Sequence, residues 1–239
     1  MSISFSAFKQ RVVKRPDSPS AVLNVTDLPT TCVLRGALAR ASTVSFNRLV
    51  RGPVITALRT LRRGEELPPE LSELRRHFER GLTYKNAAKV SALGLYLIAR
   101  GDRNRFSRCL AVAGLINGLN SQHSADFSAA ALVALAFGQE DPWVISQVES
   151  RLLNPRKPQG SAALALQLAK YVHRTAEQGR ESKLAARLLE AVLEICEENT
   201  ASGLYCVGYL PAVAIAHCMP RYSEASTRVL FKSLGERDT

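Results

Sequence analysis

ADFSAAALVALAF, the stretch at residues 125–137, carries a single charged side chain and is rich in alanine and leucine. A helix that is apolar on all sides has no face suited to water, so we expect this one to be buried at the centre of the protein. Ser124 directly precedes it, and serine is a favoured residue at the cap of a helix. The stretch predicts a fold organised around a buried helix.

The sequence on both sides of this stretch is also helical. Toward the C-terminus, Asp141-Pro142 is a strong start signal, because aspartate caps helices and proline suits their first turn. Further helices are expected at 161–178, 180–198, 203–218 and 223–234. Toward the N-terminus, helices are expected from residue 31, from Gly52-Pro53 to residue 63, from Pro68-Pro69 to Gly81, from a Thr83 cap to residue 100, and from an Asp102 cap to residue 119.

The pattern as a whole predicts an all-α protein. Alternation of apolar and polar residues, which is typical of strands, is nearly absent. No period of 20–50 residues repeats, which argues against a solenoid. The polar stretch 117–124 suggests a boundary between two helical lobes, at 31–120 and 121–239.

Charge is distributed unequally between the two halves. Residues 1–120 hold 20 basic and 8 acidic side chains, a net charge of +12, whereas residues 121–239 hold 12 and 13, a net charge of −1. Of the 32 basic residues, 24 are arginine, which binds phosphate through a planar, bidentate guanidinium. This segregation favours a polyanionic partner. The alternative is a generally basic protein with a solvated face.

Residues 1–30 form a distinct segment in which Phe5, Phe8, Val12 and Val13 are interleaved with basic residues and followed by three prolines. Proline disfavours helix at and before its own position, so we expect an extended arm. Its apolar side chains could be buried on a neighbouring protomer, which would make the protein a homo-oligomer, or on the core of the same chain.

No catalytic or metal-binding motif stands out. His217-Cys218 lies downstream of Cys196 and Cys206, but this spacing does not match the short paired ligands of structural zinc sites. The five cysteines are an odd number without a CxxC pair, which favours buried free thiols in a reducing compartment. We therefore expect no enzyme, metal, cofactor or small-molecule substrate.

We expect no targeting signal either. The N-terminus lacks the continuous apolar stretch of a secretory signal, and Ser2 excludes N-myristoylation, which requires glycine. The longest uncharged stretches fall short of the roughly 20 residues of a membrane span. The expected location is cytoplasmic, including the interior of a virion, and not secreted or transmembrane.

The candidate polyanion site consists of basic side chains of the first 120 residues. The turn at Gly101 is its expected centre, because the free N–H groups at the start of the following helix favour phosphate. Tyr84 could stack a base, with core packing equally plausible, whereas core packing is the preferred interpretation of Phe106. The candidate RNA-binding residues are Arg48, Arg51, Arg59, Arg62, Arg63, Tyr84, Lys85, Lys89, Arg100, Arg103, Arg105 and Arg108.

The stretch at residues 81–105, GLTYKNAAKVSALGLYLIARGDRNR, resembles the nucleoproteins of phlebovirus-like segmented negative-strand RNA viruses. The matching pattern is an aromatic residue, a lysine-bearing apolar helix and an Arg-Gly turn followed by basic residues. The matching residues are Tyr84, Lys85, Lys89, Leu93, Leu95, Leu97, Arg100, Gly101, Arg103 and Arg105. Residues 114–117, 128–135 and 230–235 are similar too.

The resemblance implies a two-lobed helical fold with RNA in a basic groove between the lobes. It implies RNA contacts at Arg100 and Arg103, and an N-terminal arm that docks on the next protomer. The resulting hypothesis is a nucleocapsid-type protein that coats single-stranded RNA, with a viral polymerase as a further candidate partner. Two alternatives are a matrix-type protein that polymerises on an anionic membrane, and a helical scaffold for a protein partner.

Overall fold

The structure is a computed structural model that describes residues 43–153, 158–198 and 203–235. These ranges contain eleven α-helices and one short 3-10 helix, and no strand. The all-α prediction is confirmed. The helices are α3 (Thr43–Arg62), α4 (Pro69–Glu73), α5 (Arg75–Gly81), α6 (Ala88–Gly101), α7 (Arg105–Gly118), α8 (Ala125–Gly138), α9 (Pro142–Leu152), α10 (Pro158–Glu177), α11 (Lys183–Glu198), α12 (Gly203–His217), η2 (Pro220–Tyr222) and α13 (Ser223–Gly235).

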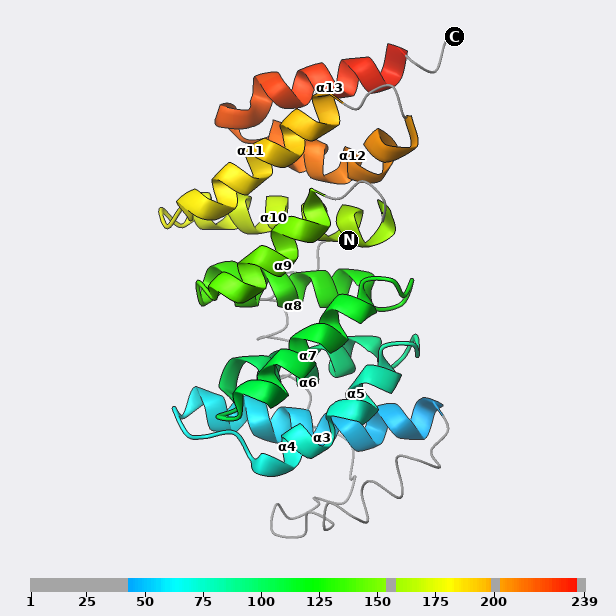
Figure 1. The fold of residues 1–239 in the computed structure, drawn as a ribbon, viewed down its shortest axis with the longest axis vertical. Coiled ribbons are helices and arrows are strands. Elements are labelled where there is room, and N and C mark those ends of the chain that lie inside the picture. Colours follow the sequence, from blue (N-terminus) through cyan, green and yellow to red (C-terminus); the bar gives the residue numbers. More distant parts are fainter. Residues whose placement is uncertain (1–42, 154–157, 199–202, 236–239) are drawn as a thin grey trace, which may run out of the picture.

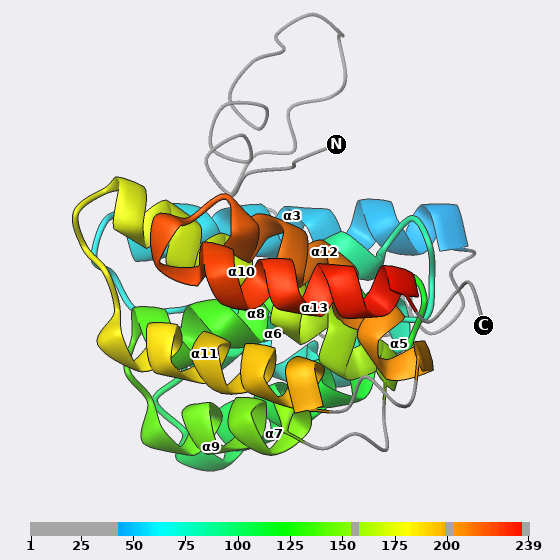
Figure 2. The same ribbon diagram turned by 90° about the horizontal axis from the view of Figure 1, so that it is seen from above.

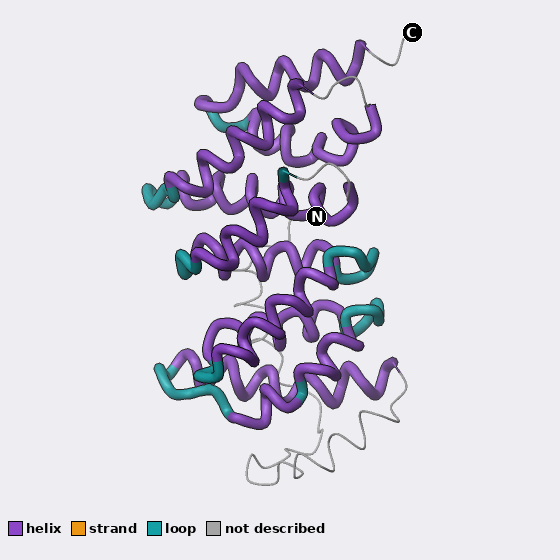
Figure 3. Tube along the Cα trace, viewed as in Figure 1, coloured by secondary structure: helices purple, strands orange, loops and turns teal. Residues whose placement is uncertain are grey.

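The helices stack along one long axis (Figure 1). α3, α6, α8, α10 and α12 pack one against the next as a continuous row. α7, α9 and α11 lie on one side of this row (Figure 2). From α5 to α9 the connections alternate between the two ends of the helices (Figure 3). This is the arrangement of a helical solenoid, in which each pair contacts mainly its neighbours. The absence of a sequence repeat was therefore a poor guide, because stacking requires matching apolar faces and not identical sequences.

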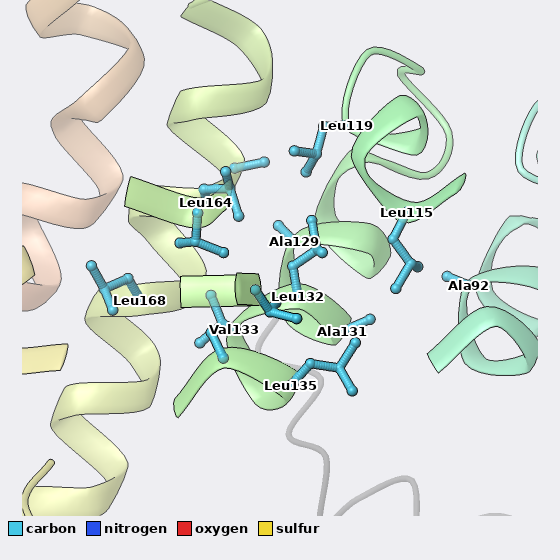
Figure 4. Packing of buried hydrophobic residues seen from close by; sticks show 14 of the residues in the cluster. Ala92, Leu115, Leu119, Ala129, Ala131, Leu132, Val133, Leu135, Leu164 and Leu168 are labelled. Carbon is cyan, nitrogen blue, oxygen red and sulfur yellow. The ribbon is translucent and has the colours of Figure 1, made fainter. Parts of the chain in front are cut away.

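The stretch at residues 125–137 forms α8, in the middle of the row, and its predicted burial is confirmed. Leu132 and Ala129 are fully buried. α8 has Leu164 and Leu168 of α10 on one side and Leu115 of α7 on the other (Figure 4). The almost uncharged composition of this helix, with Asp126 as its single charged residue, follows from its position, since the row continues on both of its flanks.

The core runs through residue 120 without a break. A single cluster of buried side chains extends from Phe46 in α3 to Val229 in α13. The predicted division into two lobes is therefore not confirmed. The predicted arm residues Phe5, Phe8, Val12 and Val13 lie outside the described residues.

The predicted helix start at Gly52-Pro53 is wrong, because α3 continues through Pro53. Phe46, Val50, Val54 and Ala57 are all buried along one face of this single helix. Proline removes one backbone hydrogen bond from a helix interior, and the continuous apolar stripe stabilises the helix on both sides of that position.

Three predicted side-chain caps are not formed. Ser124 precedes α8, but its hydroxyl donates to the carbonyl of Gly118 and makes no cap hydrogen bond. α6 begins after Ala87 without a side-chain cap, and the Thr83 hydroxyl donates instead to the carbonyl of Arg80. α7 is capped by Asn104, not by Asp102. By contrast, Asp141 caps α9 as expected, since its carboxylate accepts from the backbone N–H groups at the start of that helix.

Candidate nucleic-acid interface

α3 carries a stripe of arginines opposite its buried face. Arg48, Arg51, Arg59 and Arg62 are all exposed. At about 100° per residue they fall within an arc of about 80°, and they extend over about 21 Å of helix. Within the described residues, none of the four forms an ion pair. We refer to these four residues as the α3 stripe.

The C-terminal end of α3 meets the turn between α6 and α7. Gly101 is so close to Leu61 and Leu67 that a side chain at this position would clash with Leu67. The carboxylate of Glu66, in the loop after α3, pairs with Arg103.

This junction gathers two groups of arginines that lie about 40 residues apart in the sequence. We define the arginine end as Arg59, Arg62, Arg63, Arg100, Arg103 and Arg105, all of which are exposed. The loops 63–68 and 102–104 lie at the same side of the stack (Figure 3).

The start of α7 does not offer the free N–H groups that the sequence suggested. The Asn104 side chain accepts hydrogen bonds from the amides of Phe106 at 2.9 Å and Ser107 at 3.4 Å. The amide of Asn104 donates to the Asp102 carboxylate at 2.8 Å. The expectation of free N–H groups at this helix start is therefore wrong for Phe106 and Ser107, because the Asn104 cap already satisfies both amides.

The carboxylate of Asp102 holds this turn by hydrogen bonds. It accepts a hydrogen bond from the hydroxyl of Ser72 in α4. Burial raises the pKa of Asp102, but hydrogen bonds from Ser107, Ser72 and the backbone of Asn104, together with the Arg108 charge, hold its pKa below the ordinary value. The carboxylate thus ties α4 to the α6–α7 turn.

Arg108 is engaged by other groups of the protein. Its Nε donates to the carbonyl of Ala99 at 3.0 Å, and its Nη2 lies 3.5 Å from the Asp141 carboxylate. Arg103 is likewise paired, whereas Arg63 and Arg105 form no ion pair within the described residues. Arg100 donates to the hydroxyl of Tyr96 at 3.3 Å.

Tyr84 and Lys85 lie at the opposite end of α6 from Arg100. The two ends of this 14-residue helix are about 20 Å apart. The Tyr84 ring packs edge-on against Phe46 at 5.4 Å, and its hydroxyl accepts from Arg80 at 2.6 Å. The candidate residues therefore do not converge on a single spot, and Tyr84 is engaged by the protein itself.

One face of α6 carries Lys89, Tyr96 and Arg100. They are seven and four residues apart, which places them on one stripe of α6. Arg100 is exposed, and the other two are half-buried. Between Lys89 and Arg100, which lie eleven residues apart, α6 carries no further basic side chain.

Two exposed aromatic residues, Phe106 and Trp143, flank the arginine end. Phe106 is 71% exposed, so its predicted core packing is wrong. The buried stripe of α7 passes through Ala111 and Leu115, and counting back along this stripe excludes residue 106, a signal that was available. Trp143 is 42% exposed and lines a cavity with Arg105, which no local pattern could reveal.

The basic side chains of α13 and of the turn before it are neutralised by α11. Arg221 lies 2.6 Å from Glu190, Arg228 lies 2.9 Å from Glu197, and Lys232 lies 3.7 Å from Glu197. Glu190 and Glu197 of α11 are therefore paired with C-terminal cations. In the described residues the α11 carboxylates do not pair with the arginines of α3 or of the α6–α7 turn.

Metal-binding and membrane-spanning features are absent from the described ranges. No group of three or more His, Cys, Asp or Glu side chains is arranged to hold a metal ion there. None of the described helices combines the length and the apolar character that crossing a bilayer requires. Comparisons with protein-family models, with curated proteins and with solved structures gave no match to this chain.

Proposed function

We propose that this chain binds single-stranded RNA through its phosphates, as a coat protein does. The contact surface is the α3 stripe together with the arginine end. Phosphate contacts of this kind give affinity without sequence preference. The protein would therefore package RNA of any sequence, in line with the nucleoprotein resemblance of residues 81–105.

The contrast between paired and unpaired cations supports this proposal best. The arginines of the α3 stripe, with Arg63 and Arg105, form no ion pair in the described residues, although they are numerous and close together. The C-terminal cations Arg221 and Arg228 are paired with α11 carboxylates. Unpaired guanidinium groups repel one another, and a polyanion would relieve that repulsion.

The shape of the α3 stripe favours RNA over a membrane surface. Helices that lie on membranes place a large apolar face in the lipid, bordered by cations. In α3 the apolar face is turned inward, where Phe46 and Val50 are fully buried. The outward face offers arginine without exposed large hydrophobic residues, which suits a phosphate backbone.

The test is a direct comparison of the two polyanions. Nuclease-treated protein is titrated against a fluorescein-labelled 20-nucleotide RNA of mixed sequence, and in parallel against vesicles of phosphatidylcholine containing 30% phosphatidylserine. We expect RNA binding that is independent of sequence and weakens steeply with salt, and no flotation with the vesicles. Flotation without RNA binding would replace the proposal with the matrix-type alternative.

A further inference from the structure

A cavity of about 250 Å³ lies beside the arginine end, between the beginnings of α7 and α9. Both helices pack on α8 but not closely on each other, which leaves the space open. Its floor is apolar and comes from four helices. The buried floor residues are Ala99, Val112, Leu135 and Val144.

The rim of the cavity is polar and partly aromatic. Arg105, Arg108 and Cys109 stand at i, i+3 and i+4 on α7, so they share the face that carries Val112. Arg108 reaches across to Asp141 at 3.5 Å and thereby joins α7 to α9. Arg105 is left without an ion pair in the described residues, and Trp143 stands on the α9 side.

We propose that this cavity docks a segment of a partner protein that carries a bulky apolar side chain next to an acidic residue. The apolar side chain covers the floor, and the acidic residue pairs with Arg105. The lining holds two arginines and one aspartate, so one positive charge remains for the ligand. This proposal does not depend on RNA binding.

Size and composition both fit such a segment. Sites for drug-sized ligands usually measure about 300–1,000 Å³, so this cavity suits a single large side chain better. Tryptophan and arginine are the residue types that most often dominate the binding energy of protein interfaces. Here Trp143 and Arg105 flank an apolar centre, as the core and rim of an interface require.

The polar groups of the cavity are poorly suited to a nucleotide. Asp141 pairs with Arg108, so among the lining residues one guanidinium, that of Arg105, is left, which matches a single carboxylate better than a doubly charged phosphate. One oxygen of Asp141 is already engaged by the amides of Trp143 at 3.0 Å and Val144 at 3.3 Å. The floor is apolar and offers no further polar side chain to recognise the edge of a base.

The experiment uses synthetic heptapeptides in which a central Leu, Ile, Met, Phe or Trp is flanked by acidic residues. Fluorescein-labelled peptides are titrated by polarisation. For peptides without tryptophan, emission of the protein is followed as well, because Trp143 is the only tryptophan of the chain. Peptides with a central serine test whether charge alone is sufficient, and 5′-UMP tests for a nucleotide.

Three variants locate the binding site. Arg105→Glu should weaken binding at least about tenfold, because it puts like charges together. Trp143→Ala should weaken it about 30-fold, as loss of an interface hot spot does. Cys109→Phe should fill the cavity and abolish binding. Arg76→Glu is the matched control, since Arg76 is exposed, forms no ion pair in the described residues, does not line the cavity and lies outside the proposed RNA surface.

The supporting result is binding of the apolar-centred peptides with a change in Trp143 emission, weakened by the three variants and unaffected by Arg76→Glu. The proposal is overturned if serine-centred peptides bind equally well, if Trp143→Ala leaves affinity unchanged, or if 5′-UMP alone changes the emission. Melting curves identify any variant that does not fold. If Cys109→Phe is unstable, Arg105→Glu and Trp143→Ala decide the question.

Discussion

The number of unpaired arginines determines how steeply RNA binding should depend on salt. The α3 stripe contributes four, and Arg63, Arg100 and Arg105 bring the total to seven exposed guanidinium groups without an ion pair in the described residues. Each phosphate neutralised on a single strand contributes about 0.7 to the slope of log K against log salt. Seven contacts therefore predict a slope of about −5.

The perturbation is the triple substitution Arg48→Ala, Arg51→Ala and Arg59→Ala. It leaves four contacts, so the slope should fall to about −3. The matched control is Arg221→Ala, Arg228→Ala and Lys232→Ala, which removes the same formal charge. Those three cations are held by α11 carboxylates, so the control should keep a slope of about −5.

The assay is fluorescence polarisation of a labelled 20-nucleotide RNA, with salt varied from 50 to 500 mM. Circular dichroism confirms that both variants keep the helix content of the wild type. Equal slopes for the two triple variants would refute the reasoning, because net charge and not the placement of arginine would then govern binding. A wild-type slope near zero would show that phosphate contacts do not contribute to RNA binding.

Three further predictions concern stability. Leu132→Ala should lower the free energy of unfolding in urea by about 2–5 kcal/mol, because this side chain is fully buried in α8; a smaller loss would mean that the stack closes around the vacancy. Asn104→Ala should lower the free energy of unfolding by about 0.5–2 kcal/mol, because α7 loses its cap. Asn104→Asp should keep most of the wild-type free energy of unfolding, because aspartate also caps helices. The pKa of Asp102 in the folded protein lies below its ordinary value of 3.8. Its contribution to the free energy of unfolding is therefore complete above pH 3.8 and is lost as the pH falls through the folded pKa. The gap in unfolding free energy between wild type and Asp102→Asn should therefore be widest near neutrality and narrow below pH 4; a gap that widens in acid would contradict the assigned hydrogen bonds.

Local chemistry explains which elements could be predicted from the sequence. Asp141 and Pro142 start α9 because capping and a fixed φ act within one turn and need no distant partner. Gly81 ends α5 as expected. The buried stripes of α5 and α11 follow from spacing alone, as the burial of Phe78 and Leu189 shows.

Competing local signals explain the errors. Pro53 was interpreted as a helix start, but the apolar stripe through Val50 and Val54 continues across it. Asp102 and Asn104 are both good capping residues, and the contact of Asp102 with Ser72 of α4 leaves the capping position to Asn104. In each case contacts with other elements decided between two conformations that the local sequence allows.

The amino-acid sequence by itself determined that this protein is helical, that α8 is buried, and that its first half carries an excess of arginine, because these properties follow from residue type and period. Only the tertiary structure decided which side chains become neighbours. It brought Leu61 of α3 next to Gly101 at the end of α6 and placed Trp143 beside Arg105. It left the α3 stripe without ion pairs in the described residues, while α11 paired with Arg221 and Arg228. Such proximity depends on how whole helices stack, and the pattern within a single helix carries no information about it.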